Sequence, residues 1–213
     1  MIITVFGATG MVGKKIISYA LAQGHTVKAF GRNVESLIDE DLRNDKFEAI
    51  KGSVFDAEQV YDAVKGSDAV LSVLGGSFDG EDKTRSLGIK TIAQQMQKAG
   101  VQRIVALGGA GVLDAGDGDY VLNKPSYPAE YLPVGKEHLQ AYLNLKDTNL
   151  DWTFVCAPNI QDKDATGSYI TNANFAPEPN LNHINAGDLA QFMTNEASQN
   201  KYLYQRVGIS ART

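Results

Sequence analysis

The sequence contains very little cysteine. Cys156 is the single cysteine among 213 residues, so no disulfide can form within the chain. A protein without disulfides suits a reducing compartment, and we therefore expect a cytoplasmic location. With one cysteine and three histidines, the sequence contains no cluster of Cys and His at the spacing of metal ligands, so no metal site is predicted.

The chain also lacks an excess of positive charge and any long hydrophobic run. Lys and Arg total 20 against 25 Asp and Glu, a net charge of −5, and no basic stretch stands out. Neither nucleic acid nor an anionic membrane is therefore an expected partner. No apolar run reaches the roughly 18 residues of a membrane span. The first predicted strand starts almost at residue 1, so no signal peptide is expected. We therefore expect a small molecule as the partner, bound by a monomer or weak dimer.

Glycine, by contrast, is plentiful and follows predicted strands. The apolar run 2–6 predicts a buried strand, and an amphipathic helix begins soon after it. Between them stands Gly7-Ala8-Thr9-Gly10-Met11-Val12-Gly13. A strand, a glycine turn and a helix form the first unit of a dinucleotide fold, in which free amides at the helix N-terminus hold phosphates. We predict cofactor contacts from Gly7, Thr9, Gly10, Met11, Val12 and Gly13, with an ordinary glycine turn as the alternative.

Strand and helix patterns alternate along the rest of the chain. This alternation predicts an α/β fold, a doubly wound, Rossmann-like parallel sheet with helices on both faces. We expect one domain over residues 1–213, with a small substrate-side portion from about 158 to 213. The predicted strands are 2–6, 26–30, 47–50, 69–73, 104–107, 152–155 and 202–207. One helix is predicted after residue 10, and others over 57–65, 83–99 and 133–146. A last helix is predicted with Asp188 as its cap.

The end of the second strand indicates which nucleotide binds. It contains Phe30-Gly31-Arg32-Asn33 and no carboxylate that could accept bonds from the ribose hydroxyls of NAD. Arg32 offers a planar set of donors that suits a 2′-phosphate, and Asn33 stands beside it. NADP(H) is therefore the predicted cofactor. The alternative is that Arg32 is only a solvated loop charge.

The wide glycine spacing resembles that of extended and atypical short-chain dehydrogenase/reductases, and further motifs bring the resemblance closer. Over nearly its full length the chain is similar to the NAD(P)H-binding, NmrA-like branch, which includes biliverdin-IXβ reductase/flavin reductase. The motifs are Val5 to Gly10, Phe30 to Asn33, Ser67 to Val70, Leu74-Gly75, Gly100 to Val105, Ala157 to Ile160 and Gly187 to Ala190.

This resemblance implies further cofactor contacts after the other strands. They are Ser53 and Val54 under the adenine, Leu74, Gly75 and Gly76 beside the ribose, and Gly108, Gly109, Pro158, Asn159 and Ile160 after the fifth and sixth strands. The family usually has Asp at the position of Ser53. Gly76 is equally well explained as a plain turn glycine.

The family's usual acid, a Tyr four residues before a Lys, is missing from the expected helix. Lys136 has the right distance to Pro158, but Leu132 stands four residues before it. Tyr131 is one position away, and such a slip turns a helical side chain by about 100°. Gly109 stands where the family often has Ser. The candidates for catalysis are therefore Lys136, Asn159 and Tyr131, with a solvated helix charge as the alternative for Lys136.

The resemblance implies an NADPH-dependent reductase that passes a hydride to a planar acceptor, a flavin, a quinone or a tetrapyrrole-like compound, with little or no protein acid. The alternative is a non-catalytic NADP(H) sensor of the NmrA-like type. A nucleotide-sugar epimerase or dehydratase is a further alternative, although the segment after strand six is short for it.

Two loops and one histidine leave open alternatives. The loop 111–131 carries Tyr120, Tyr127 and Tyr131 and could form a lid or be anchored to the body. The Asn- and Pro-rich segment 172–185 could close over substrate or pack on the sheet. His138 matches a family histidine, although a packing role is more usual for such a residue.

Overall fold

The computed structural model, which describes residues 1–37 and 45–212, contains an eight-stranded sheet in the order β3-β2-β1-β4-β5-β6-β10-β8. Every neighbouring pair is parallel except β10 with β8. The strands are β1 (Ile2–Phe6), β2 (Thr26–Gly31), β3 (Phe47–Lys51), β4 (Ala69–Ser72), β5 (Arg103–Gly109), β6 (Asp151–Ala157), β8 (Tyr169–Ala173) and β10 (Gln205–Ala211). A separate parallel pair joins β7 (Asn159–Gln161) to β9 (His183–Asn185).

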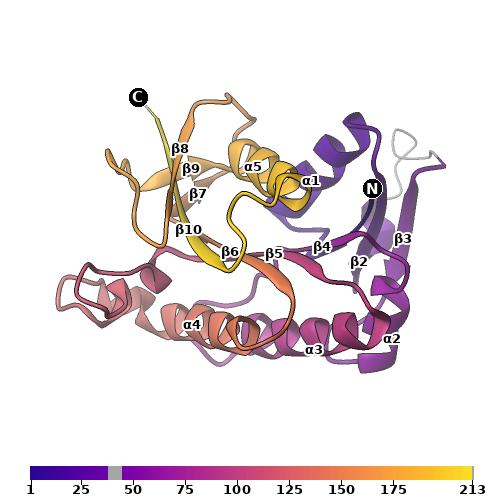
Figure 1. Ribbon diagram of the computed structural model, residues 1–213, viewed down its shortest axis with the longest axis horizontal. Coiled ribbons are helices and arrows are strands. Elements are labelled where there is room, and N and C mark those ends of the chain that lie inside the picture. The colour runs from indigo at the N-terminus through magenta and orange to yellow at the C-terminus, as the bar shows by residue number, and fades with distance from the viewer. Residues whose placement is uncertain (38–44, 213) are drawn as a thin grey trace.

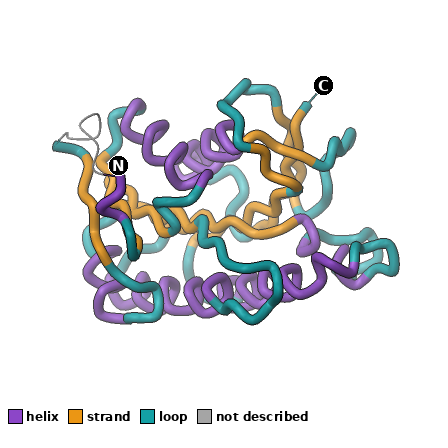
Figure 2. The backbone as a smooth tube through the Cα atoms, turned by 180° about the vertical axis from the view of Figure 1, so that it is seen from behind, coloured by secondary structure: helices purple, strands orange, loops and turns teal. Residues whose placement is uncertain are grey.

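Helices cover both faces of the sheet (Figure 1). The first layer holds α1 (Met11–Ala22) and α5 (Ala186–Gln199), and the second holds α2 (Ala57–Val64), α3 (Thr84–Ala99) and α4 (Leu132–Lys146). Seen from behind, the same two helical layers enclose the strands (Figure 2). This is the Rossmann-like α/β fold that the sequence predicts.

Two apolar cores follow from these layers. One lies between the sheet and α1 with α5, and includes Ile16 and Met193. The other lies between the sheet and the second layer, and includes Ile92 and Phe154. Because central strands are buried on both faces, they consist of near-continuous apolar runs, which is why 2–6 and 69–73 could be recognised from the sequence.

The helix boundaries agree closely with the local sequence signals. The carboxylate of Asp56 accepts hydrogen bonds from the backbone N–H groups of Glu58 and Gln59, so it caps α2 as predicted. Gly100 ends α3 with φ 73°, the left-handed conformation that favours glycine. Helix α1 buries Val12, Ile16 and Ala20 on one face.

Four sequence predictions need correction. Asp188 is not a helix cap, because α5 begins at Ala186 with Asn185 as its N-cap. Strand β5 runs on through Gly108 and Gly109 instead of closing before them. The last strand is Gln205–Ala211 and not 202–207. Residues 159–161, 169–173 and 183–185 form strands in a part of the chain where none was predicted between 155 and 202.

The buried carboxylate of Asp188 instead holds the loop before β8. It accepts hydrogen bonds from the backbone N–H groups of Thr166 and Gly167, at 2.7 Å each, and from the side chains of Thr166 and Asn185. Part of the segment 172–185 packs on the sheet, since Ala173 lies opposite Val207 in the β8–β10 pair.

Among residues 1–37 and 45–212, no helix is both long and apolar enough to cross a membrane.

Candidate functional site

The strand order switches direction between β1 and β4, at the carboxyl ends of these two strands. From β1 the chain passes to β2 and β3 on one side, and from β4 it continues to β5 and β6 on the other. Open α/β sheets bind ligands at such a switch in strand order. The predicted glycine turn follows β1 and therefore lies at this point.

The glycines of the turn are required by close backbone contacts. Gly7 has φ 81°, and a methyl group there would lie 2.4 Å from the carbonyl oxygen of Val73. A methyl group at Gly13 would lie 2.2 Å from the carbonyl oxygen of Gly7. Gly10 donates its N–H to Gly7 at 3.0 Å and forms the N-cap of α1. The helix therefore starts directly against the turn, as the sequence interpretation requires.

The N-terminus of α1 is left open by the side chains around it. Among residues 1–37 and 45–212, no side chain makes a capping hydrogen bond to it, and its first turn contains no acidic residue. Its first backbone N–H groups and the positive end of its dipole suit a phosphate. Of the predicted contacts here, Thr9 is partly buried and Met11 is exposed, while the Val12 side chain is buried in the core. Only the backbone of Val12 can therefore face a ligand.

Arg32 and Asn33 lie just after β2, and both are exposed. In the part of the chain that the structure describes, the guanidinium of Arg32 makes no hydrogen bond or ion pair. Lys51 lies opposite Gly31 in the β2–β3 pair, and its ammonium group, unlike the guanidinium of Arg32, binds the Glu35 carboxylate at 3.1 Å. Arg32 is therefore a charge whose donors are free for a ligand.

The turn after β3 is tied together by its own side chains. The backbone N–H of Ser53 donates to the Gln59 side chain at 2.9 Å, and the Ser53 hydroxyl accepts from Phe55. Val54 and Leu74 both pack against α3 at Gly88, where a methyl group would lie 2.6 Å from Leu74 and 3.3 Å from Val54. These two predicted contacts therefore form a joint apolar wall beside α3.

The two glycines after β4 differ. A methyl group at Gly75 would meet open space, whereas one at Gly76 would lie 2.7 Å from the Asp82 carboxylate and 2.9 Å from the Arg85 guanidinium. Arg85 also donates to the carbonyl oxygens of Gly76 and Ser77, at 3.0 and 2.9 Å. Gly76 is thus explained by loop packing, the alternative that the sequence left open, while Gly75 borders open space.

At the ends of β5 and β6, the predicted contacts also divide. A methyl group at Gly108 would lie 2.1 Å from the Phe154 ring, so this glycine serves core packing. Gly109 instead faces the imidazole of His138, whose Cδ2 would lie 3.0 Å from a methyl group there. Asn159 is exposed at the start of β7, and Pro158 and Ile160 on either side of it are partly buried.

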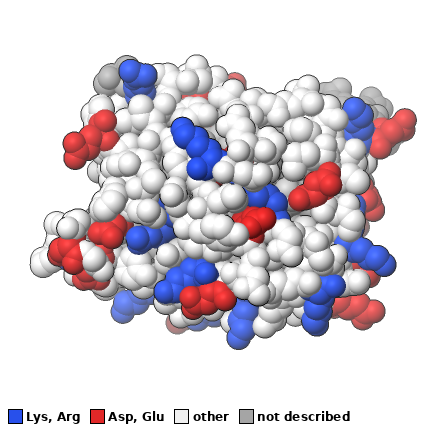
Figure 3. Space-filling model, in the orientation of Figure 1, with Lys and Arg blue, Asp and Glu red and all other residues white. Residues whose placement is uncertain are grey.

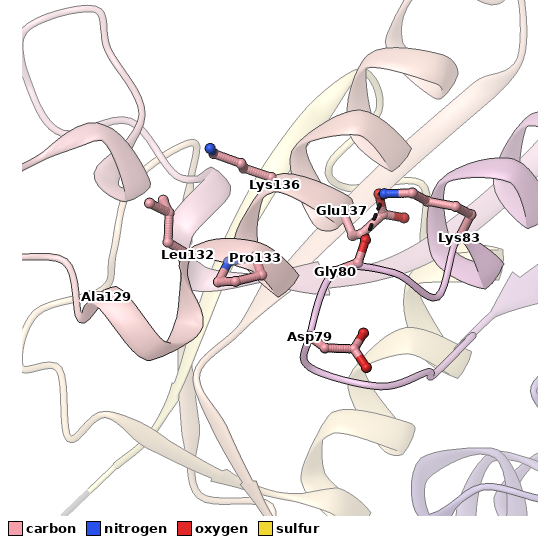
Figure 4. Close-up of a pocket in the computed structure, with 8 residues that line it drawn as sticks. All are labelled: Asp79, Gly80, Lys83, Ala129, Leu132, Pro133, Lys136 and Glu137. Carbon is pink, nitrogen blue, oxygen red and sulfur yellow. Dashed lines mark hydrogen bonds and ion pairs between the residues drawn. The ribbon is translucent and has the colours of Figure 1, made fainter.

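Helix α4 places Lys136 at the edge of a shallow cavity of about 330 Å³ (Figure 4). The cavity lies between the loop after β4 and the start of α4, and its lining residues are Asp79, Gly80, Lys83, Ala129, Leu132, Pro133, Lys136 and Glu137. Lys136 is exposed and points away from the Lys83–Glu137 pair. Tyr131 is 49% exposed and occupies the residue position just before α4, without a capping hydrogen bond from its side chain.

Glu137 is a site residue that the sequence interpretation missed. It is 5% exposed, and its carboxylate binds the Lys83 ammonium at 2.8 Å and the Ser86 hydroxyl at 2.7 Å. Lys83 also donates to the carbonyl oxygen of Gly80. The buried carboxylate therefore fixes the loop after β4 onto α4. The available signal was a charged residue on the inward face of a helix, but no contact partner could be read from the sequence.

His138 is held neutral on the sheet side of α4. Its Nδ1 is buried and has no hydrogen-bond partner among the described residues. Burial, assisted by the positive charge of Arg85, lowers the pKa of His138 to about 3. A neutral imidazole can still donate and accept hydrogen bonds.

The tyrosines of loop 111–131 occupy different environments. Tyr120 is partly buried, with the Arg206 guanidinium 5.2 Å from its ring and Tyr142 6.3 Å away. Tyr127 is partly buried against α4, whereas Tyr131 is exposed. At Tyr120 and Tyr127 the loop is anchored to the body.

Charged groups of both signs are interspersed on the face that Figure 3 presents. No extended area of one sign covers this face.

Comparisons with known proteins agree with the fold and with the turn. A model of the NAD(P)H-binding family matches residues 7–200. The uncharacterized protein YwnB of Bacillus subtilis is 28% identical over 174 residues, 79% of this chain and 78% of its own length.

Two solved structures resemble the whole chain. A Streptococcus pneumoniae protein provisionally named an NADH-flavin reductase is 27% identical, with a TM-score of 0.83 and 100% of both chains covered. A Bacteroides thetaiotaomicron protein provisionally named an epimerase is 29% identical, with a TM-score of 0.86, covering 100% of this chain and 97% of the other.

Proposed function

Since the chain belongs to the NAD(P)H-binding family, we propose that it is an NADPH-dependent reductase that passes a hydride to a planar acceptor such as a flavin or a quinone. The family and its neighbours support an oxidoreductase-like protein that binds NAD(P)H. The choice of NADPH, the catalytic role and the class of acceptor are our proposals.

The open N-terminus of α1 carries this proposal. The turn fits a pyrophosphate, because Gly7 and Gly13 let it pack directly against the start of α1 and no side chain of the described residues makes a capping hydrogen bond to the helix end. Arg32, with its free guanidinium, would hold the 2′-phosphate. Gly75 borders open space and Lys136 lines the cavity beside α4, and we assign these two residues to the ribose and the nicotinamide ring. When bound, NADPH supplies a hydride to the acceptor.

The remaining residues favour an acceptor that needs orientation more than acid catalysis. Gly109 and Leu132 leave the family's Ser and Tyr positions without a hydroxyl. The chain then contributes by excluding water and by holding the two flat ring systems together. Such proximity alone can drive the hydride transfer. The provisional name of the Streptococcus pneumoniae neighbour supports a flavin as one such acceptor.

A sensor that binds NADP(H) without turnover is the second candidate, and the same missing hydroxyls favour it. An epimerase, as in the provisional name of the Bacteroides thetaiotaomicron neighbour, ranks below both. An epimerase needs an acid or base at the reacting carbon, and neither the Ser nor the Tyr position supplies one.

The deciding experiment follows NADPH oxidation at 340 nm (a property of the coenzyme) with riboflavin, FMN and menadione in turn. An NADPH titration by fluorescence runs in parallel. Turnover above the uncatalysed rate supports the reductase. Binding without turnover of any acceptor contradicts the reductase and favours the sensor, and the absence of binding contradicts both.

A further inference from the structure

The hydroxyl of Tyr127 reaches the backbone of two elements at the candidate site. A methyl group at Gly111, just after β5, would lie 2.8 Å from this hydroxyl. A methyl group at Gly135, in the first turn of α4, would lie 2.9 Å from it. The phenol therefore stands between the exit of β5 and the start of α4, where a methyl group at either glycine would press on its hydroxyl.

This hydroxyl is a donor without a partner. Among the described residues it makes no hydrogen bond, although the backbone N–H of Tyr127 is fixed to the carbonyl oxygen of Lys124 at 3.0 Å. The ring is only partly buried, so the hydroxyl is not sealed in the core. Burial, with a smaller effect of Tyr131, raises the pKa of Tyr127 above its usual value of 10. The phenol therefore keeps its proton at neutral pH.

A second polar group without a partner lies one helical turn further along α4. His138 is three residues after Gly135, so the two share a face of the helix. Its ring lies against Gly109, and its buried Nδ1 has no hydrogen-bond partner within residues 1–37 and 45–212. Tyr127 and His138 thus flank the same strand end, at which the position usual for a serine hydroxyl is occupied by Gly109.

We infer that Tyr127 is the proton donor of this enzyme, supplied from the loop 111–131 in place of a tyrosine on the helix. The inference rests on the proposed hydride transfer and replaces solvent as the source of the proton. It also narrows the acceptor to a conjugated carbonyl compound of the quinone class, because reduction of a quinone places negative charge on oxygen.

The step balances without any further reactant. The hydride from NADPH reduces the quinone, the O–H bond of Tyr127 breaks, and its proton passes to the quinone oxygen. Water then returns a proton to the phenolate oxygen of Tyr127. The sum is NADPH, quinone and one proton giving NADP⁺ and hydroquinone.

The test compares wild type with Tyr127→Phe, using menadione as acceptor between pH 6 and 9. The ring is kept, so Gly111 and Gly135 remain in contact with it. We expect kcat at pH 9 to fall about 100-fold, and kcat of the variant to rise as the pH is lowered because solvent must supply the proton. The wild-type kcat should vary little over this range, and the NADPH affinity should be the same for both proteins.

Gly135→Ala provides an independent variant. Its methyl group would displace the far end of the Tyr127 side chain, while alanine forms helix better than glycine. We expect a lower kcat with an unchanged or higher melting temperature, a combination that loss of packing does not produce. Tyr61→Phe on α2, which removes a tyrosine hydroxyl away from the loop 111–131, is the matched control and should leave kcat unchanged.

The outcomes separate the two proposals. If wild type reduces menadione and Tyr127→Phe has the same kcat and pH profile, the inference is wrong and the reductase stands. If wild type binds NADPH but reduces no acceptor, both are wrong. A fall in kcat that is equal at every pH also overturns the inference, because it indicates packing.

Discussion

Arg32 is the residue on which the choice between NADP and NAD depends. Its guanidinium is exposed and has no partner in the described parts of the chain. Hydrogen bonds to charged groups contribute about 1.5–3 kcal/mol, so Arg32→Ala should weaken NADPH binding about 10- to 100-fold. NADH binding should change little, because NADH lacks the 2′-phosphate. Fluorescence titrations with both nucleotides measure the ratio.

The control for Arg32 is a lysine on β2, the strand that precedes it. The ammonium group of Lys28 is used internally, donating to the carbonyl oxygen of Lys65 at 2.8 Å. Lys28→Ala should therefore keep the preference for NADPH over NADH. A similar loss of preference in both variants would indicate a general effect of positive charge and would contradict the role of Arg32.

His138 should make stability depend on pH. The unfolded chain binds a proton at this side chain near pH 6.5, whereas burial and the charge of Arg85 lower its pKa in the folded protein to about 3. Between these values the unfolded state holds more protons, so the free energy of unfolding rises with pH and becomes level above about 6.5. Replacing His138 by Gln removes this contribution.

Urea unfolding at pH 7 and pH 5 measures the effect. On lowering the pH, wild type should lose about 2 kcal/mol more than His138→Gln, since one proton contributes about 1.4 kcal/mol per pH unit. The difference between the two proteins cancels the contribution of other groups. Parallel losses in both would show that His138 titrates normally in the folded state.

At the level of elements, the junction of β1 and α1 depends on a single missing side chain. A methyl group at Gly13 would lie 2.2 Å from the carbonyl oxygen of Gly7 and 2.9 Å from Ala8, all backbone atoms that cannot move independently of the helix. Gly13→Ala should therefore cost about 1–3 kcal/mol of stability. It should also weaken NADPH binding by at least about tenfold, because α1 and the turn would separate.

Gly75→Ala is the stability control for this substitution. A methyl group there meets open space, and the residue does not have a positive φ, so the free energy of unfolding should change by less than about 0.5 kcal/mol. Urea titrations of the two variants give the comparison. Equal losses would mean that the turn tolerates no side chain anywhere, and the contact at Gly13 would not be the cause.

The sequence predicted those elements that have strong local signals. Asp56 and Gly100 mark helix ends by their own chemistry, and both predictions were confirmed. β7, β8 and β9 have only three, five and three residues, and they pair with strands that lie elsewhere in the sequence. Such pairing is not encoded in local periodicity.

Asp188 shows how a correct local signal can have a different cause. An acidic residue before an apolar helical run is typical of an N-cap. Here Asn185 precedes the helix, and the Asp188 carboxylate bonds instead with Thr166 and Gly167, about twenty residues earlier. The carboxylate is needed in either case, but only the tertiary structure decides which backbone it satisfies.

Across the whole molecule, the candidate site draws on the ends of six strands and on α4. The glycine turn could be predicted because all of its parts are adjacent in sequence. The Tyr127 hydroxyl and Gly135 could not be related in this way, since their contact depends on how the loop 111–131 folds back onto α4. Phe154, similarly, explains Gly108 only after β5 and β6 are paired.

At the amino ends of the strands, opposite the candidate site, a buried ion pair links the sheet to a helix. The Arg103 guanidinium at the start of β5 binds the Glu196 carboxylate on α5 at 3.0 Å, and their side chains are 7% and 1% exposed. Arg103 also donates to the Thr153 hydroxyl and to the carbonyl oxygen of Asp151. The pair therefore links β5, β6 and α5.

Glu196→Gln tests this link, because it removes the charge while almost preserving the shape. It leaves the buried guanidinium without its counter-ion, so we expect a loss of about 3–5 kcal/mol in the free energy of unfolding. Glu35→Gln, which breaks an exposed pair with Lys51, should cost less than about 1 kcal/mol. Equal small losses would show that Arg103 is stabilised by its neutral partners alone. NADPH affinity of the folded Glu196→Gln protein should remain that of wild type, because the pair lies at the amino ends of the strands and the nucleotide cradle at their carboxyl ends.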